Sequence, residues 1–260
     1  MEVRQGFLPV PDPIAFNLFG LEIRWYAVCV TLAILIAFGF AYVRAPKKGL
    51  SQDVLLDMFL WGVPAGIIGA RAYYVIFEWD YYRAHPDQIL NLRAGGLAIH
   101  GGIICAFIAV YLVCKVRKQD FLRWCDHLAP SWPLGQAIGR WGNYFNSEAH
   151  GGPTNLPWAI YADGEWVHPT FLYESIWCFL LFLFLTWFYD HGKHRFKGQL
   201  ISLYLMLYSV ERFFVESLRT DSLYIGPLRQ AQVISIAIFI FGAVLYIVCK
   251  NKAKNKEIKA

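Results

Sequence analysis

The chain has 260 residues and a formal net charge of +5; 57% of its residues are hydrophobic, only 17% are charged, and the mean hydropathy is +0.38. Soluble domains average about 45–50% apolar and about 25% charged residues, so this chain has too few charges to cover a water-facing globule. The composition predicts an all-α integral membrane protein and excludes disordered, collagen-like and disulfide-framework proteins. No run of basic residues lies in an aromatic or glycine-rich tract, so nucleic acid is not an expected partner.

Apolar segments of membrane-spanning length recur along the whole chain. A bilayer core about 30 Å thick needs roughly 20 apolar residues in a helix. We predict seven transmembrane helices, in segments 18–42, 54–77, 97–115, 122–142, 171–189, 199–217 and 231–249. The fourth is the weakest because two prolines, Pro130 and Pro133, interrupt it, so a broken or partly re-entrant helix is an alternative. No repeat or long linker divides the chain, and we expect a single transmembrane domain over residues 1–260.

Two excursions separate the predicted helices. Segment 78–96 is polar and aromatic, and its tryptophan and tyrosines suit the headgroup layer, which predicts an outer interfacial arm. Segment 143–169 is rich in glycine and proline with short apolar runs. This composition predicts a small extracytoplasmic cap of strands and turns.

The basic residues are divided between two sets of loops. The segments after the first, third, fifth and seventh spans hold 15 of the 24 basic residues and all the lysines. The positive-inside rule places these segments in the cytoplasm, with the N-terminus outside and the C-terminus cytoplasmic. The other nine basic residues are Arg4, Arg24, Arg71, Arg83, Arg93, Arg140, Arg212, Arg219 and Arg229. Arginine binds phosphate through a planar fork, so these arginines predict an outer-facing site for an anionic group such as a lipid phosphate.

One predicted helix carries four polar residues on a single face. Tyr208, Arg212, Glu216 and Arg219 are spaced by four, four and three residues. An arginine within a span is costly unless it is paired or faces a polar cavity, so such residues suggest a functional site. Glu216 can neutralise one arginine and leave net positive charge for a ligand. The alternative is a structural ladder of ion pairs.

Four other segments contribute polar groups at the same predicted membrane level. The run after Gly139 offers Arg140 as a phosphate clamp and two asparagines as neutral donors and acceptors, although it also fits a helix-capping turn. Successive glycines after His100 can present backbone N–H groups to an anion, and histidine titrates near neutrality. Glu174 falls just inside the fifth span, and Tyr26 lies near the outer end of the first. No zinc or nucleophilic-serine motif accompanies them, so we expect chemistry without a metal or cofactor.

Four motifs in order carry a resemblance to a known family. They are HGG from His100, GRWGNYFNSEAHGG from Gly139, HPTFLYE from His168 and ERFFVESLR from Glu211. With them the chain resembles the bacterial prolipoprotein diacylglyceryl transferase family over essentially its whole length. The resemblance implies a multi-pass enzyme of the bacterial cytoplasmic (inner) membrane. Such an enzyme moves the diacylglyceryl group of phosphatidylglycerol onto the lipobox cysteine of a prolipoprotein signal peptide, forming a thioether and releasing glycerol phosphate.

The resemblance also assigns roles to residues of this chain. The implied catalytic residues are His100, Arg140, Arg212 and Tyr26. The implied substrate-binding residues are Asn143, Asn146, Glu148, Gly151, Tyr208, Glu174, Glu216 and Arg219. Arg140 and Arg212 are the expected phosphate ligands. We predict His100 as the base, with Tyr26 as the alternative, because a phenol with a pKa near 10 is mostly protonated at neutral pH. Two other interpretations are a lipid or anion transporter and a structural membrane scaffold. The lack of repeat symmetry in the sequence makes the transporter less favoured.

Overall fold

The structure is a computed structural model, and it describes residues 8, 12–92, 95–220 and 222–257. Arg4 and Arg93, two of the nine arginines predicted to face outward, lie outside these residues, as does part of the predicted arm. The chain forms two compact units, one of Met1–Ala41 with Cys125–Ala260 and the other of Tyr42–Trp124.

Five helices of the described residues are long and apolar enough to cross a membrane. They are α1 (Trp25–Arg44), α2 (Gln52–Phe77), α4 (Ile99–Val116), α7 (Thr170–Asp190) and the Gln230–Asn255 part of α9 (Gln230–Glu257). They coincide with the first, second, third, fifth and seventh predicted spans. Large hydrophobic side chains are exposed along all five, which is the surface that lipid covers in a membrane protein. The chain is therefore a largely helical membrane protein.

The fourth predicted span is not one continuous helix. Its residues form α5 (Phe121–Leu128) and α6 (Ser131–Phe145), which a turn at Ala129 and Pro130 separates. Proline has no backbone N–H and disfavours helical geometry in the residue before it, which explains the break. Of the alternatives for segment 122–142, the broken helix is the one that the structure shows.

The sixth predicted span coincides with α8 (Gln199–Glu216). A side chain of α5 holds the first turn of this helix. The buried carboxylate of Asp126 accepts hydrogen bonds from the backbone N–H groups of Gly198 at 2.6 Å and Ile201 at 3.0 Å. It also accepts one from His194 at 2.9 Å. Backbone donors at a helix start need such an acceptor when they are buried.

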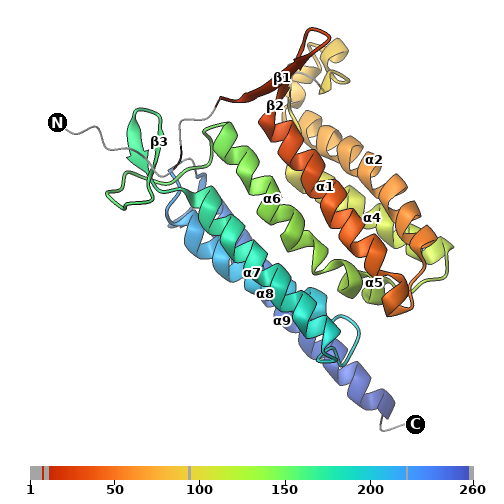
Figure 1. Ribbon diagram of the computed structural model, residues 1–260. Helices are drawn as coiled ribbons and strands as arrows, with labels where there is room; N and C mark the ends of the chain where they lie inside the picture. Colours follow the sequence, from red (N-terminus) through yellow and green to blue (C-terminus); the bar gives the residue numbers. More distant parts are fainter. Residues whose placement is uncertain (1–7, 9–11, 93–94, 221, 258–260) are drawn as a thin grey trace. The chain divides into compact units, whose positions relative to one another are not determined.

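Four helices of the larger unit, α6 to α9, pack against one another in chain order. Figure 1 shows α7, α8 and α9 side by side, and α6 packs along α7. Three antiparallel hairpins lie at helix ends. They are β1 (Ile14–Leu18) with β2 (Leu21–Arg24), β3 (Ile160–Ala162) with β4 (Glu165–Val167), and β5 (Tyr224–Ile225) with β6 (Leu228–Arg229).

The β3–β4 hairpin covers the end of α6 and the start of α7. Its turn residues, Asp163 and Gly164, have φ of 51° and 85°, the left-handed pair that a tight hairpin requires. Its inner side chains join Tyr144 and Phe171 in a buried cluster. This packing orients the two helix ends that carry several of the predicted site residues.

The smaller unit pairs α2 with α4 through glycines. A Cβ added to Gly102 would lie 3.2 Å from the carbonyl oxygen of Gly66, so the two backbones are nearly in contact. Gly69 likewise faces Gly101. The glycines after His100 therefore allow close helix packing, in the manner of small residues between transmembrane helices. The anion-binding role of their N–H groups stays a prediction.

In the predicted arm, the structure describes α3 (Trp79–Tyr82) and the short 3-10 turn η2 (Pro86–Gln88). Arg71 on α2, only 6% exposed, holds the arm by hydrogen bonds of 2.6–3.1 Å. The acceptors are the carbonyl oxygens of Gln88, Ile89, Asn91, Gly95 and Gly96. Because these carbonyls occupy its guanidinium, Arg71 stabilises the arm instead of binding an external anion. The prediction that included Arg71 among the arginines of an outer anion site is therefore wrong for this residue.

Candidate active site

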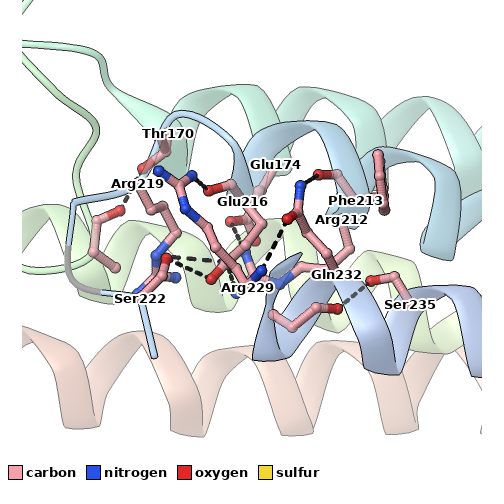
Figure 2. Close-up of polar contacts among 12 residues, drawn as sticks. Thr170, Glu174, Arg212, Phe213, Glu216, Arg219, Ser222, Arg229, Gln232 and Ser235 are labelled. Atoms are coloured by element: carbon pink, nitrogen blue, oxygen red, sulfur yellow. Dashed lines mark hydrogen bonds and ion pairs between the residues drawn. The ribbon is translucent and has the colours of Figure 1, made fainter. Parts of the chain in front are cut away.

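Arginines and glutamates alternate across three helices of the larger unit. Glu174 on α7 is 1% exposed and directs one carboxylate oxygen to each of two arginines. Its Oε2 forms an ion pair with Nη2 of Arg140 on α6, and its Oε1 accepts a hydrogen bond of 2.9 Å from Nη1 of Arg212 on α8. Nη2 of Arg212 lies 2.7 Å from Oε2 of Glu216, one turn further along α8. Figure 2 shows Glu174, Arg212 and Glu216 converging from α7 and α8.

Glu216 also contacts the segment beyond α8. Its Oε1 accepts a hydrogen bond of 2.6 Å from the hydroxyl of Ser222, and Nε of Arg219 lies 3.9 Å from its Oε2. The guanidinium of Arg229 donates to its backbone carbonyl. Oε1 of Glu216 thus accepts a hydrogen bond and Oε2 lies within ion-pair distance of two arginines, which restricts the orientation of the side chain.

Burial differs between the two kinds of charge. The side chains of Glu174 and Glu216 are 2% and 5% exposed, whereas those of Arg140, Arg212 and Arg219 are 15–20% exposed. A guanidinium carries five N–H donors, and the contacts to the glutamates use only part of them. The buried carboxylates therefore fix the guanidinium groups of Arg140 and Arg212, which are less buried than the glutamates that hold them.

The turn after α6 gathers three of the predicted substrate-binding residues. Asn143 donates a hydrogen bond of 2.9 Å to the carboxylate of Glu148, and the Glu148 N–H donates back to the Asn143 carbonyl at 3.0 Å. Ser147 and Ala149 adopt positive φ, an uncommon geometry for these residues. The amide oxygen of Asn146 is buried without a hydrogen-bond donor among the described residues. This turn therefore offers an unsatisfied acceptor near the end of α6.

Gly151 lies where three segments of the chain meet. Its N–H donates to the His168 carbonyl at 2.9 Å, and it forms a β-bridge with Arg219. A Cβ at this position would lie 2.7 Å from Cβ of His168 and 3.0 Å from the carbonyl oxygen of Leu218. Only glycine fits where the outer turn, the start of α7 and the end of α8 meet.

The two predicted tyrosines also lie in this unit. Tyr26 on α1 packs over Gly142, where an added Cβ would lie 2.9 Å from its ring, and it is close enough to Arg140 and Glu148 to interact electrostatically. Tyr208 interacts in the same way with Arg140 and stacks on Tyr204 with ring centroids 5.8 Å apart.

His100 belongs to the smaller unit. It is the second residue of α4, its side chain is exposed, and its ring centroid lies 6.4 Å from that of Tyr73. The larger unit brings together the other eleven predicted site residues. The role of His100 at the arginine cluster stays a prediction.

Sequence reasoning missed one charged residue of the cluster. Glu211 on α8 is buried, and neither of its carboxylate oxygens has a hydrogen-bond donor among the described residues. It is close enough to Arg140 and Arg212 to interact electrostatically. Glu211 directly precedes Arg212 in the sequence, which could have indicated an ion pair. Consecutive residues of a helix point in different directions, however, so spacing alone places Glu211 on a different part of the helix surface from Arg212.

These buried ion pairs between α6, α7 and α8 lie in a protein with five described helices that are long and apolar enough to cross a membrane. The family model described as prolipoprotein diacylglyceryl transferase matches residues 13–248 of this chain. The chain therefore belongs to the prolipoprotein diacylglyceryl transferase family.

Curated relatives match over nearly the full chain. The phosphatidylglycerol–prolipoprotein diacylglyceryl transferase of Finegoldia magna is 52% identical over 248 residues, which cover 95% of this chain and 100% of the relative. The proteins of the same name from Clostridioides difficile and Clostridium novyi are 48% and 49% identical, over 94% and 95% of this chain and 98% of each relative.

Proposed function

We propose that this protein transfers the diacylglyceryl group of phosphatidylglycerol to the lipobox cysteine in the signal peptide of a prolipoprotein. Family membership and the names of the relatives support the reaction and both substrates. The structural observation that carries the proposal is the single buried carboxylate of Glu174 between Arg140 and Arg212. It holds two guanidinium groups from different helices at one place, as a phosphate ligand requires.

The proposed reaction is a substitution at carbon. The cysteine sulfur, as thiolate, forms a bond to C3 of the diacylglycerol moiety, and the bond between that carbon and the phosphate oxygen breaks. The products are a thioether and glycerol phosphate, and the thiol proton passes to a base. Negative charge grows on the departing phosphate, where Arg140 and Arg212 stabilise it. One such prearranged donor is typically worth about 10²–10³ in rate.

The other residues have supporting roles in this proposal. His100 accepts the thiol proton, because a thiol is a poor nucleophile until it is deprotonated. Tyr26 is the alternative base. Asn143, Asn146 and Glu148 bind the polar part of the lipid, and Tyr208, Glu216 and Arg219 complete the phosphate site. No metal or cofactor takes part in the proposed steps.

We further propose the membrane arrangement. All seven predicted segments cross the bacterial cytoplasmic (inner) membrane, with α5 and α6 together forming the broken fourth span and α8 the sixth. Both compact units form one transmembrane domain. The N-terminus lies outside and the C-terminus in the cytoplasm. In this arrangement the end of α6, the start of α7 and the end of α8 share the outer side, beneath the β3–β4 cap, and the segment 78–96 lies in the outer interface as an arm.

Product analysis tests the activity. Purified protein in liposomes is given labelled phosphatidylglycerol and a peptide with a lipobox cysteine, and mass spectrometry detects the thioether. We expect product with the cysteine peptide and none with its Cys→Ser counterpart. Bound lipid without any thioether would contradict the proposal and favour a lipid transporter.

A further inference from the structure

Gln232, near the start of α9, connects that helix to the last turn of α8. Its side chain is buried, with 8% of the residue exposed. The amide Nε2 donates to the hydroxyl of Ser217 at 2.9 Å and to the carbonyl of Phe213 at 3.3 Å, while Oε1 accepts from the backbone N–H of Arg229 at 3.1 Å. Figure 2 shows Gln232 between these helices, close to Arg229.

Half of this arrangement is a common helix-capping contact. Gln232 is the third residue of α9, and a glutamine there often accepts a hydrogen bond from the N–H of the residue before the helix. Capping needs only the amide oxygen. The amide nitrogen reaches the neighbouring helix and satisfies both of its donors there, so the side chain connects two helices.

The turn that Gln232 contacts carries part of the candidate site. Glu216 lies between Phe213 and Ser217 in the sequence, and its carboxylate holds Arg212 at 2.7 Å. Arg229, whose backbone N–H Gln232 binds, donates its guanidinium to the carbonyl of Glu216. Gln232 therefore restrains Glu216 along two routes, through the α8 turn and through Arg229.

We propose that Gln232 is a positioning residue for diacylglyceryl transfer, which keeps Glu216 in the orientation that aims Arg212 at the lipid phosphate. The inference rests on the proposed function. Gln232 acts through Glu216 and needs no contact with either substrate. A small displacement of a phosphate ligand is costly, because a misplacement of about 1 Å can reduce a rate by about a hundredfold.

The variant Gln232→Met tests this role, because methionine has a similar length and volume but none of the amide hydrogen bonds. Ser235→Ala is the matched control, since Ser235 is buried one turn further along α9 and donates at 2.7 Å to Ala231 of its own helix. We expect Gln232→Met to raise KM for phosphatidylglycerol and to lower kcat/KM by about ten- to a hundredfold. Ser235→Ala should stay within about twofold of the unchanged protein.

A double-mutant cycle separates positioning from general destabilisation. If Gln232 acts through Glu216, Gln232→Met in a Glu216→Gln background should lower kcat/KM by no more than about twofold further. Independent losses that multiply would overturn the inference, as would an equal loss in Ser235→Ala or full activity in Gln232→Met. If Gln232→Met does not fold, Gln232→Asn, one methylene shorter, enters the same cycle.

The proposed function and this inference fail in different ways. The absence of thioether product from the unchanged protein would reject the transferase activity. The positioning role can be tested without the transfer reaction. Native mass spectrometry would measure the affinity for phosphatidylglycerol of the four proteins of the cycle: the unchanged protein, Gln232→Met, Glu216→Gln and the double variant. We expect the same coupling between Gln232 and Glu216 in lipid affinity, and additive effects there would overturn the inference.

Discussion

Glu174 accepts a hydrogen bond of 2.9 Å from Arg212 across the contact between α7 and α8, and its other carboxylate oxygen pairs with Arg140. One buried side chain thereby fixes two arginines whose positions in the sequence are far apart. Removing a partner from a buried ion pair commonly costs about 3–5 kcal/mol, because the remaining charge is left without compensation. The site therefore depends on Glu174 for both its geometry and its stability.

The substitution Glu174→Gln tests this dependence. An amide keeps one oxygen but turns an NH₂ group toward the second arginine, so only one of the two pairs survives. We expect lower thermal stability and a loss of turnover of about a hundredfold or more, as for a missing transition-state donor. Glu165→Gln, in the exposed part of the β3–β4 hairpin, is the control and should behave like the unchanged protein. Equal behaviour of the two variants would refute the role of Glu174.

Arg212 should not be replaceable by lysine. Its Nη1 binds Glu174 while its Nη2 binds Glu216, and a single ammonium group cannot reproduce this planar fork. We expect Arg212→Lys to be nearly as inactive as Arg212→Ala in the thioether assay. Full activity of the lysine variant would show that a point charge suffices and that the forked geometry of the guanidinium is not required.

Gly151 should tolerate no side chain. In Gly151→Ala the new Cβ would lie 2.7 Å from His168, so the outer turn must move away from α7 and α8. Overpacking of this kind typically costs about 1–3 kcal/mol, which thermal denaturation of the purified protein can measure, and activity should fall with it. Gly152→Ala is a close control, because its Cβ would meet Thr220 at an ordinary 3.8 Å. Similar losses in both variants would contradict the explanation.

The base assignment gives a separable prediction. His100→Gln should reduce turnover while the binding of phosphatidylglycerol persists, because glutamine can hydrogen-bond but cannot accept the thiol proton. Turnover measured from pH 6 to 9, beside lipid binding by native mass spectrometry, checks this expectation. Unchanged turnover over the whole range would exclude His100 and direct attention to Tyr26.

Much of the helical framework follows from the sequence, because five long apolar segments become helices with similar ends. The break between α5 and α6 follows from Pro130. The contact between Arg212 and Glu216 follows from their spacing within one helix. The contact of Glu174 with Arg140 could not be predicted in this way, because it depends on how α6 and α7 pack against each other.

Arg71 and Arg140 illustrate the limit of sequence patterns. Both follow glycine-containing runs in predicted spans, and their sequence contexts suggest the same role. Their partners differ, since backbone carbonyls surround Arg71, whereas Arg140 pairs with a buried carboxylate. The function of Gly151 was equally hidden, because the segments that crowd it are distant in the chain.

The binding of phosphatidylglycerol by Arg140 and Arg212 is the central claim, and an affinity measurement tests it most directly. Native mass spectrometry would compare the unchanged protein with the Arg140→Gln/Arg212→Gln double variant, using phosphatidylglycerol and, as a reference, a diacylglycerol of the same chains. We expect the double variant to lose its preference for phosphatidylglycerol and to keep its affinity for diacylglycerol. An unchanged preference would show that these arginines do not bind the phosphate.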